Sequence, residues 1–167
     1  MGWDKGVDFE VAYNKILRNM RKNKYPNVCY DSILLIQLRN GSRVGEAVDA
    51  FTQYLRSKVL ECYVRVEKRK DGLMRLVVIP REIIDYANVC TELLNVPREK
   101  LVNRVKYYVL SKYGFNTHSL RYAFITYLLR QGVNPAIISK ITGHKNLNHI
   151  LTYTQQKAGD EILRNLL

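Results

Sequence analysis

Apolar residues recur at helical spacing along the first third of the chain. Positions three or four residues apart predict an amphipathic helix ahead of Pro26. A strongly apolar helix is predicted near 30–39, and a third helix from Arg43 has an apolar face of its own. The two amphipathic faces consist of Phe9, Tyr13, Ile16, Leu17 and Met20 in the first helix, and of Val44, Ala47, Val48 and Phe51 in the third.

The pattern then changes to that of two strands. Residues 59–66 and 73–79 are rich in β-forming side chains, and the segment 68–72 between them contains the turn signal Asp71-Gly72. An antiparallel hairpin is therefore predicted. Further helices are expected near 81–95, 98–112 and 118–130, from Asn134-Pro135 to Gly143, and from Ala158 onward. The predicted fold class is α+β, mostly α, with residues 1–167 in a single domain.

The charge balance indicates a polyanionic partner. The 167 residues include 27 Lys and Arg against 15 Asp and Glu, which gives a net charge of +12 and a pI near 9.7. Charge alone fits RNA-binding, ribosomal and membrane-surface proteins equally well. The apolar runs are too short for a membrane span, which needs about 20 residues, and the amino end does not resemble a secretory signal.

The cysteines and histidines do not form a recognisable metal or redox motif. Cys29, Cys62 and Cys90 are widely separated, odd in number and without a C-x-x-C pair, so reduced and mostly buried thiols are expected. The sequence also lacks an H-E-x-x-H motif and a cluster of acidic residues. No metal site is therefore predicted.

Two short motifs carry basic side chains suited to an anion. If one helix ends at Gly41 and the next starts at Ser42, Arg43 lies in a first helical turn, where free N–H groups attract anions. In a helix over 118–130, His118 and Arg121 share one face, separate from the apolar stripe. Each motif alone is more typical of solvated charged residues. The apolar stripe consists of Leu120, Phe124, Tyr127 and Leu128.

In combination these motifs resemble the tyrosine recombinase (phage integrase) family. The resemblance rests on G-x-R-x-x-E at 41–46, H-x-L-R at 118–121, G-H at 143–144 and Tyr153, nine residues after His144. It covers nearly the whole chain and is most specific over 116–154. It implies a helical catalytic domain with a small antiparallel sheet. Family members usually carry a separate amino-terminal DNA-binding clamp domain, which we expect to be absent from this chain.

The resemblance also implies which residues form the site. These are Arg43, His118, Arg121, His144 and the nucleophile Tyr153, with Glu46 orienting Arg43. The family uses a hairpin lysine as well. Counting back from Arg75 selects Lys70, with Lys68 as the alternative, and both could instead be surface lysines that affect affinity only. Tyr122 departs from the family pattern, which often has histidine or arginine at that position.

The implied chemistry is transesterification without cofactor, metal or energy source. Tyr153 attacks a backbone phosphorus and forms a 3′-phosphotyrosyl link, while Arg43 and Arg121 hold the non-bridging oxygens through forked hydrogen bonds. His144 is expected to donate a hydrogen bond to the phosphate. His118 accepts the tyrosine proton or orients the phosphate, and Lys70 protonates the leaving 5′-oxygen.

The expected partner is double-stranded DNA, bound by a homo-oligomer that forms a tetramer in synapsis. The helix 158–167 is expected to pack on its own domain or, by family habit, on a neighbouring subunit. The expected setting is the cytoplasm and nucleoid, or a host cytoplasm if the protein is viral. Alternative functions are type IB topoisomerase-like relaxation, a non-enzymatic basic nucleic-acid-binding domain and, disfavoured by the missing carboxylate cluster, a metal-dependent nuclease.

Overall fold

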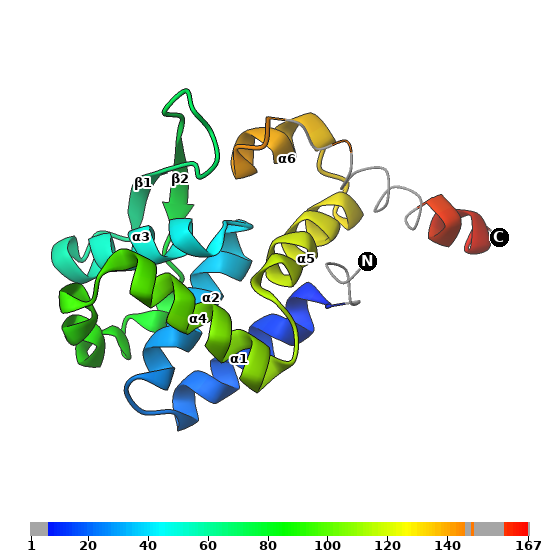
Figure 1. The fold of residues 1–167 in the computed structure, drawn as a ribbon. Helices are drawn as coiled ribbons and strands as arrows, with labels where there is room; N and C mark the ends of the chain where they lie inside the picture. The colour runs from blue at the N-terminus through cyan, green and yellow to red at the C-terminus, as the bar shows by residue number, and fades with distance from the viewer. Residues whose placement is uncertain (1–6, 146–147, 149–158, 167) are drawn as a thin grey trace.

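The computed structural model describes residues 7–145, 148 and 159–166, and these residues form a mostly helical fold with one small antiparallel sheet (Figure 1). This confirms the predicted fold class. A further helical segment covers 159–164. In chain order, the elements are α1 (Phe9–Lys22), α2 (Asn27–Asn40), α3 (Val44–Ser57), β1 (Glu61–Arg65), β2 (Met74–Val78), η1 (Arg81–Ile83), η2 (Ala87–Asn95), α4 (Arg98–Tyr113), α5 (Thr117–Arg130) and α6 (Pro135–Thr142).

Short-range hydrogen bonds fix the helix ends. The Asp8 carboxylate accepts from the Val11 N–H at 2.9 Å at the start of α1, and the Asn116 side chain accepts from the Ser119 N–H at 3.2 Å at the start of α5. Gly41 ends α2 in the left-handed conformation, with φ 61°. A Cβ at Gly41 would overlap the ring of Phe124, so this position needs glycine for space as well as for backbone conformation.

Helix α2 lies at the centre of the core and is buried along almost its whole length. It packs against α1, α3, α4, α5 and β2 (Figure 1). A helix that is apolar on all sides is expected in such a central position. The apolar run near 30–39 thus predicted the buried helix that the other elements surround.

The sheet is a hairpin whose inner face contributes to the core. Glu61 pairs with Val78 at one end of the ladder and Arg65 with Met74 at the other. The strands confirm the predicted hairpin but are shorter than predicted. Residues 66–73 connect them, and the left-handed residues of this connection are Lys68, with φ 65°, as well as the predicted Gly72, with φ 71°.

The predicted helix over 81–95 is replaced by the two 3₁₀ segments η1 and η2. The buried residues of η2 are Ala87, Cys90 and Leu93. Their spacing of three residues matches the three-residue repeat of a 3₁₀ helix rather than the longer repeat of an α-helix.

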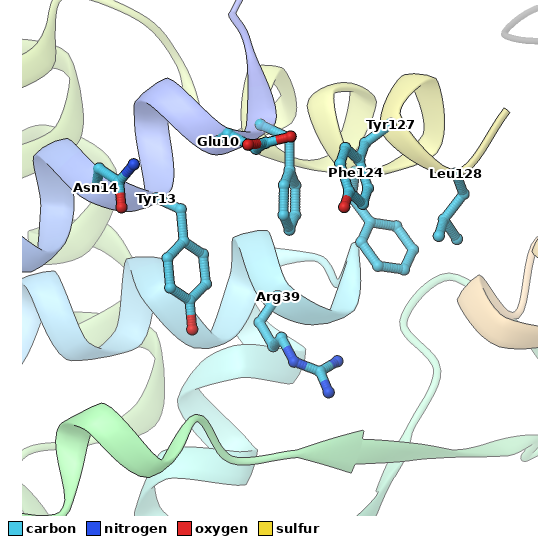
Figure 2. A pocket seen from close by; sticks show the side chains of 8 residues that line it. Glu10, Tyr13, Asn14, Arg39, Phe124, Tyr127 and Leu128 are labelled. Carbon is cyan, nitrogen blue, oxygen red and sulfur yellow. The ribbon is translucent and has the colours of Figure 1, made fainter. Parts of the chain in front are cut away.

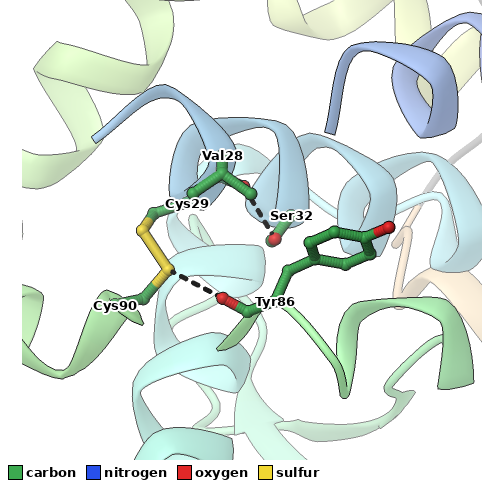
Figure 3. Close-up of a disulfide and its surroundings, with 5 residues drawn as sticks. All are labelled: Val28, Cys29, Ser32, Tyr86 and Cys90. Carbon is green, nitrogen blue, oxygen red and sulfur yellow. Dashed lines mark hydrogen bonds between the residues drawn. A yellow bond between two sulfur atoms is a disulfide. The ribbon is translucent and has the colours of Figure 1, made fainter. Parts of the chain in front are cut away.

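The expectation of reduced thiols is wrong for two of the three cysteines. Cys29 of α2 and Cys90 of η2 form a disulfide between residues 61 apart in sequence, and Tyr86 of the preceding turn contributes a carbonyl oxygen 3.8 Å from Cys90 Sγ (Figure 3). Cys62 is a free thiol, and burial raises its pKa. Sequence spacing could not reveal the pairing, because the fold brings together two cysteines that lie in no common motif.

The last described segment does not pack its apolar side chains onto the core. Ile162, Leu163 and Leu166 are 67, 71 and 67% exposed, and the segment meets α5 through Arg130 and Glu161, whose charged atoms lie 3.9 Å apart. Residues 159–166 therefore contact their own domain through a charged pair and leave the apolar face that was expected to pack largely exposed. None of the described helices has the length and apolar character that a membrane span requires.

Candidate active site

The site is organised around the carboxylate of Glu46, which is fully buried in the first turn of α3. Its Oε1 lies 3.6 Å from Arg75 Nη1 and 4.0 Å from Arg121 Nη1, and its Oε2 lies 3.5 Å from Arg43 Nη1. One negative charge thus holds guanidinium groups from α5, from β2 and from the turn before α3. The two arginines singled out from the sequence are brought together here.

Arg43 is the N-cap of α3, so the expected position in a first helical turn is wrong by one residue, because the helix begins at Val44. Its backbone N–H donates to Glu46 Oε1 at 3.1 Å, and its Nη1 donates to the carbonyl oxygen of Glu67 at 3.0 Å. The Glu67 N–H in turn donates to Glu46 Oε2 at 3.0 Å. The backbone of Glu67 in the hairpin connection therefore holds the Arg43 side chain in place.

Arg75 was not among the predicted site residues. It lies opposite Val64 in the ladder, on the inner face of the hairpin, and is 4% exposed. Its guanidinium donates to the Asn40 carbonyl oxygen, and its Nη1 is buried without a hydrogen bond to the described residues. The available signal in the sequence was an arginine at an inward-facing strand position, since a buried cation requires a buried partner.

Arg121 and His144 are in direct contact. Arg121 Nη2 lies 2.9 Å from His144 Nε2 and 3.0 Å from Nδ1, and Thr142 Oγ1 lies 2.6 Å from His144 Nδ1. The Thr142 hydroxyl also donates to the Ile138 carbonyl oxygen at 3.0 Å. Because a hydroxyl has one proton, Nδ1–H must then donate to Thr142, which leaves the Nε2 lone pair to accept from Arg121.

Burial and nearby positive charge lower the pKa values of both His144 and Arg121. Burial lowers the pKa of His144 to about 3, and the charges of Arg121, Arg43 and Arg75 act in the same direction. Burial likewise lowers the pKa of Arg121 to about 9, Arg43 adds to the shift and Glu46 opposes it. His144 is therefore neutral at neutral pH, and Arg121 remains largely charged. Arg121 Nη1, like the same atom of Arg75, is buried without a hydrogen bond to the described residues.

His118 is an exposed residue of the first turn of α5, one residue after the helix begins. Burial lowers its pKa, followed by the charges of Lys68, Arg121, Arg43 and Lys106. Lys68 is the largest of these charge effects. The charge of Lys68 is therefore felt at His118.

Glycine at 143 joins α6 to the hairpin next to His144. It ends α6 with φ 76°, and a Cβ there would lie 2.7 Å from Val66 Cγ2. Arg69 Nη1 donates to the Gly143 carbonyl oxygen at 3.2 Å. The G-H pair therefore has a physical basis, because the glycine allows the close approach that brings the histidine to Arg121.

Tyr153 and the residues around it lie outside the described residues, so the position of the predicted nucleophile stays a prediction. Among the described residues, no group of three or more histidine, cysteine or acidic side chains is arranged to hold a metal ion.

An apolar hollow lies elsewhere, between α1, α2 and α5, and has a volume of about 420 Å³. Figure 2 shows Tyr13, Arg39, Phe124 and Tyr127 at its walls. None of the side chains around Glu46 lines this hollow, so it is separate from the candidate site.

Comparisons with known proteins agree with the motifs. Residues 98–159 match the model of the phage integrase family. The chain is 40% identical to "Putative integrase ORF241" of Acidianus two-tailed virus, over 98% of this chain and 68% of that protein. It is 33% identical to "Uncharacterized protein MJ0770" of Methanocaldococcus jannaschii, over 98% and 88%. Identity to "Tyrosine recombinase XerA" of Thermococcus kodakarensis is 29%, over 72% and 39%. No solved structure matches significantly.

Proposed function

Since the chain belongs to the phage integrase family of tyrosine recombinases, we propose that it cuts and rejoins DNA at a specific site through a covalent 3′-phosphotyrosyl intermediate. The observation that carries this proposal is the arrangement of Arg43 and Arg121 on the single carboxylate of Glu46, with His144 against Arg121. Two forked cations held in this way suit the oxygens of one phosphodiester.

The arginines stabilise the charge that develops at phosphorus. As the tyrosine oxygen attacks, negative charge grows on the non-bridging oxygens, and pre-positioned guanidiniums need no reorganisation to meet it. The buried Arg121 Nη1, which has no hydrogen bond to the described residues, offers a donor for such an oxygen. Lysine at either position would lose the forked geometry, so Arg43→Lys and Arg121→Lys are both expected to fail.

The remaining groups move protons. Tyr153 attacks phosphorus, the P–O5′ bond breaks, and its electron pair goes to the 5′-oxygen, which takes a proton from a lysine ammonium. The phenol proton passes to His118, which can also orient the phosphate. We assign the lysine role to Lys68 in place of the expected Lys70, because the backbone of the adjacent Glu67 is bonded to both Arg43 and Glu46, and because the charge of Lys68 lowers the pKa of His118. Attack of the 5′-hydroxyl on the phosphotyrosyl link reverses each step and reseals the strand.

DNA is the proposed partner, and two or more copies of the chain assemble on it. The net charge of +12 supports binding to the phosphate backbone. The exposed Ile162, Leu163 and Leu166 of the last described segment support an apolar contact with a neighbouring subunit. Because the proposed substrate is DNA, we place the protein in the cell compartment that contains that DNA.

The proposal is tested with a nicked duplex that traps the covalent adduct. The wild-type protein is expected to give a slow-migrating DNA band on denaturing electrophoresis that protease removes, and Tyr153→Phe is expected to give none. An adduct retained in Tyr153→Phe would refute this nucleophile, and absence of adduct with the wild type on its own target DNA would refute the proposed chemistry. Joining of two separate duplexes distinguishes recombination from relaxation of supercoils.

A further inference from the structure

Lys68 lies between two residues that are each tied to a different part of the fold. On its amino-terminal side, the Glu67 carboxylate lies 3.5 Å from Arg98 Nη2 of α4. On its carboxyl side, Arg69 Nη1 donates to the carbonyl oxygen of Gly143, the residue that ends α6, at 3.2 Å. Arg69 Nη2 also pairs with Asp71 Oδ2 at 2.6 Å. Both neighbours of the lysine are therefore held.

The Arg98 contact is anchored in turn to α3. Arg98 Nε donates to Asp49 Oδ1 at 2.7 Å, and its Nη2 donates to Asp49 Oδ2 at 3.3 Å, which makes a forked pair. A forked pair fixes the plane of the guanidinium, so its position relative to Glu67 is fixed as well. The hairpin connection is thus linked through Arg98 to the same helix that carries Glu46.

The Glu67 side chain is closely confined at this contact. Its Oε1 is buried and makes no hydrogen bond to the described residues, so the charge of Arg98, 3.5 Å away, compensates it. A Cβ at Gly45 would overlap this oxygen and would lie 2.5 Å from Arg98 Nη2. Glycine in the first turn of α3 therefore leaves the space in which Glu67 and Arg98 meet.

The backbone of Lys68 needs such support. Its φ of 65° lies in the left-handed region, which a residue with a side chain adopts only where the surrounding structure holds it there. The Glu67 peptide is also fixed, because its N–H donates to Glu46 and its carbonyl oxygen accepts from Arg43. Loss of the Arg98 contact would leave these backbone bonds in place, but the Glu67 side chain next to Lys68 would no longer be held by an ion pair.

We propose that Arg98, acting through Glu67, is a positioning residue that holds Lys68 for protonation of the leaving 5′-oxygen. This inference rests on the proposed function and adds to it a residue outside the phosphate cradle, which consists of Arg43 and Arg121. Arg98 contacts neither the cradle arginines nor His144 through any described bond. Its loss should therefore affect proton transfer to the leaving group more than it affects charge stabilisation at phosphorus.

The test compares two leaving groups in single-turnover cleavage. In the normal substrate the P–O5′ bond breaks and the oxygen needs a proton, whereas in a 5′-bridging phosphorothiolate the P–S bond breaks and leaves a thiolate that needs none. Arg98→Gln is expected to slow cleavage of the normal substrate by about tenfold or more, with the phosphorothiolate cleaved at nearly the wild-type rate. Lys68→Ala should show the same pattern more strongly.

Two further variants keep the outcome clear. Glu67→Gln removes the other partner of the ion pair and is expected to repeat the Arg98→Gln pattern, so the test stands even if Arg98→Gln folds poorly. Lys100→Gln removes a charge from the exposed side of the same helix and is expected to leave both rates unchanged. Both variants are measured at saturating DNA, which separates the chemical step from binding.

The outcomes separate this inference from the proposed function. Equal slowing of both substrates in Arg98→Gln and Glu67→Gln, or no slowing of either, would overturn the positioning role. The positioning role would also be overturned if Lys70→Ala, and not Lys68→Ala, slowed cleavage of the normal substrate while cleaving the phosphorothiolate at nearly the wild-type rate. Lys70 and not Lys68 would then be the lysine that protonates the leaving oxygen. If the wild-type protein forms no adduct with either substrate, the proposed function itself fails.

Discussion

Glu46 and Arg121 form a charged contact in which both side chains are almost completely buried, with Oε1 and Nη1 4.0 Å apart. The same carboxylate also holds Arg43 and Arg75, so the charge of Glu46 offsets mutual repulsion among three guanidiniums. This relation makes the carboxylate essential to the cradle although it has no expected role in proton transfer.

Glu46→Gln is therefore expected to destabilise the fold. The variant keeps the size of the side chain but leaves three arginines without their counter-charge, and breaking a buried ion pair costs about 3–5 kcal/mol. Urea denaturation should show a loss of this order, together with loss of the covalent adduct. Glu61→Gln, on the exposed face of β1, provides a matched control and should change stability little. Equal stability of the two variants would contradict the central role of Glu46.

DNA binding is expected to take up protons at His144. The pKa of this ring is lowered to about 3 in the free protein, and a bound phosphodiester adds a negative charge that raises it again. The complex then binds more protons than the free protein, so affinity should fall as pH rises through the pKa of the bound state. Calorimetry between about pH 5 and pH 8 in buffers of different ionisation enthalpy measures this uptake.

His144→Gln supplies the control for that measurement. It keeps a hydrogen-bonding side chain beside Arg121 but cannot titrate, so the buffer dependence should diminish by the share that His144 contributes. Any proton uptake that remains in His144→Gln is assigned to His118, whose pKa is also lowered in the free protein. Identical proton uptake in the wild type and in His144→Gln would exclude His144 as the group that titrates.

Reduction of the Cys29–Cys90 disulfide is expected to lower stability. The bond closes a loop between residues 61 apart, and for a loop of this size the chain-entropy model gives about 4 kcal/mol. A paired Cys29→Ser and Cys90→Ser variant should show a lower thermal midpoint that reductant no longer changes. Cys62→Ser is the control and should respond to reductant as the wild type does. A wild-type midpoint that is insensitive to full reduction would contradict this stabilisation.

Gly143→Ala is expected to disturb the site as well as the fold. The left-handed φ of 76° penalises alanine, and the added methyl group would lie 2.7 Å from Val66 Cγ2. Gly132→Ala shares the left-handed backbone, with φ 82°, but has open space around the new methyl group. Both variants should lose about 1 kcal/mol for the backbone, and Gly143→Ala should lose more and should also slow cleavage. Equal effects of the two would show that the Val66 contact is unimportant.

Features that depend on neighbouring residues followed from the amino-acid pattern. The apolar run of α2, the cap at Asn134, and the ends of helices at Gly41 and Gly143 are set by interactions within a few residues, so their prediction was confirmed. The motifs around Arg43 and Arg121 also predicted membership of the phage integrase family, and the comparisons with known proteins confirm it.

Contacts between distant segments could not be obtained in this way. The pairing of Cys29 with Cys90, the burial of Arg75 beside Glu46 and the contact of Arg98 with Glu67 each join residues that no local pattern relates. The orientation of Lys68 likewise depends on how residues 66–73 are held by α4 and α6. Helix and strand signals are short-range, whereas charge pairing and burial depend on which surfaces meet once the chain has folded, and that is the reason the arrangement of the site emerged only in three dimensions.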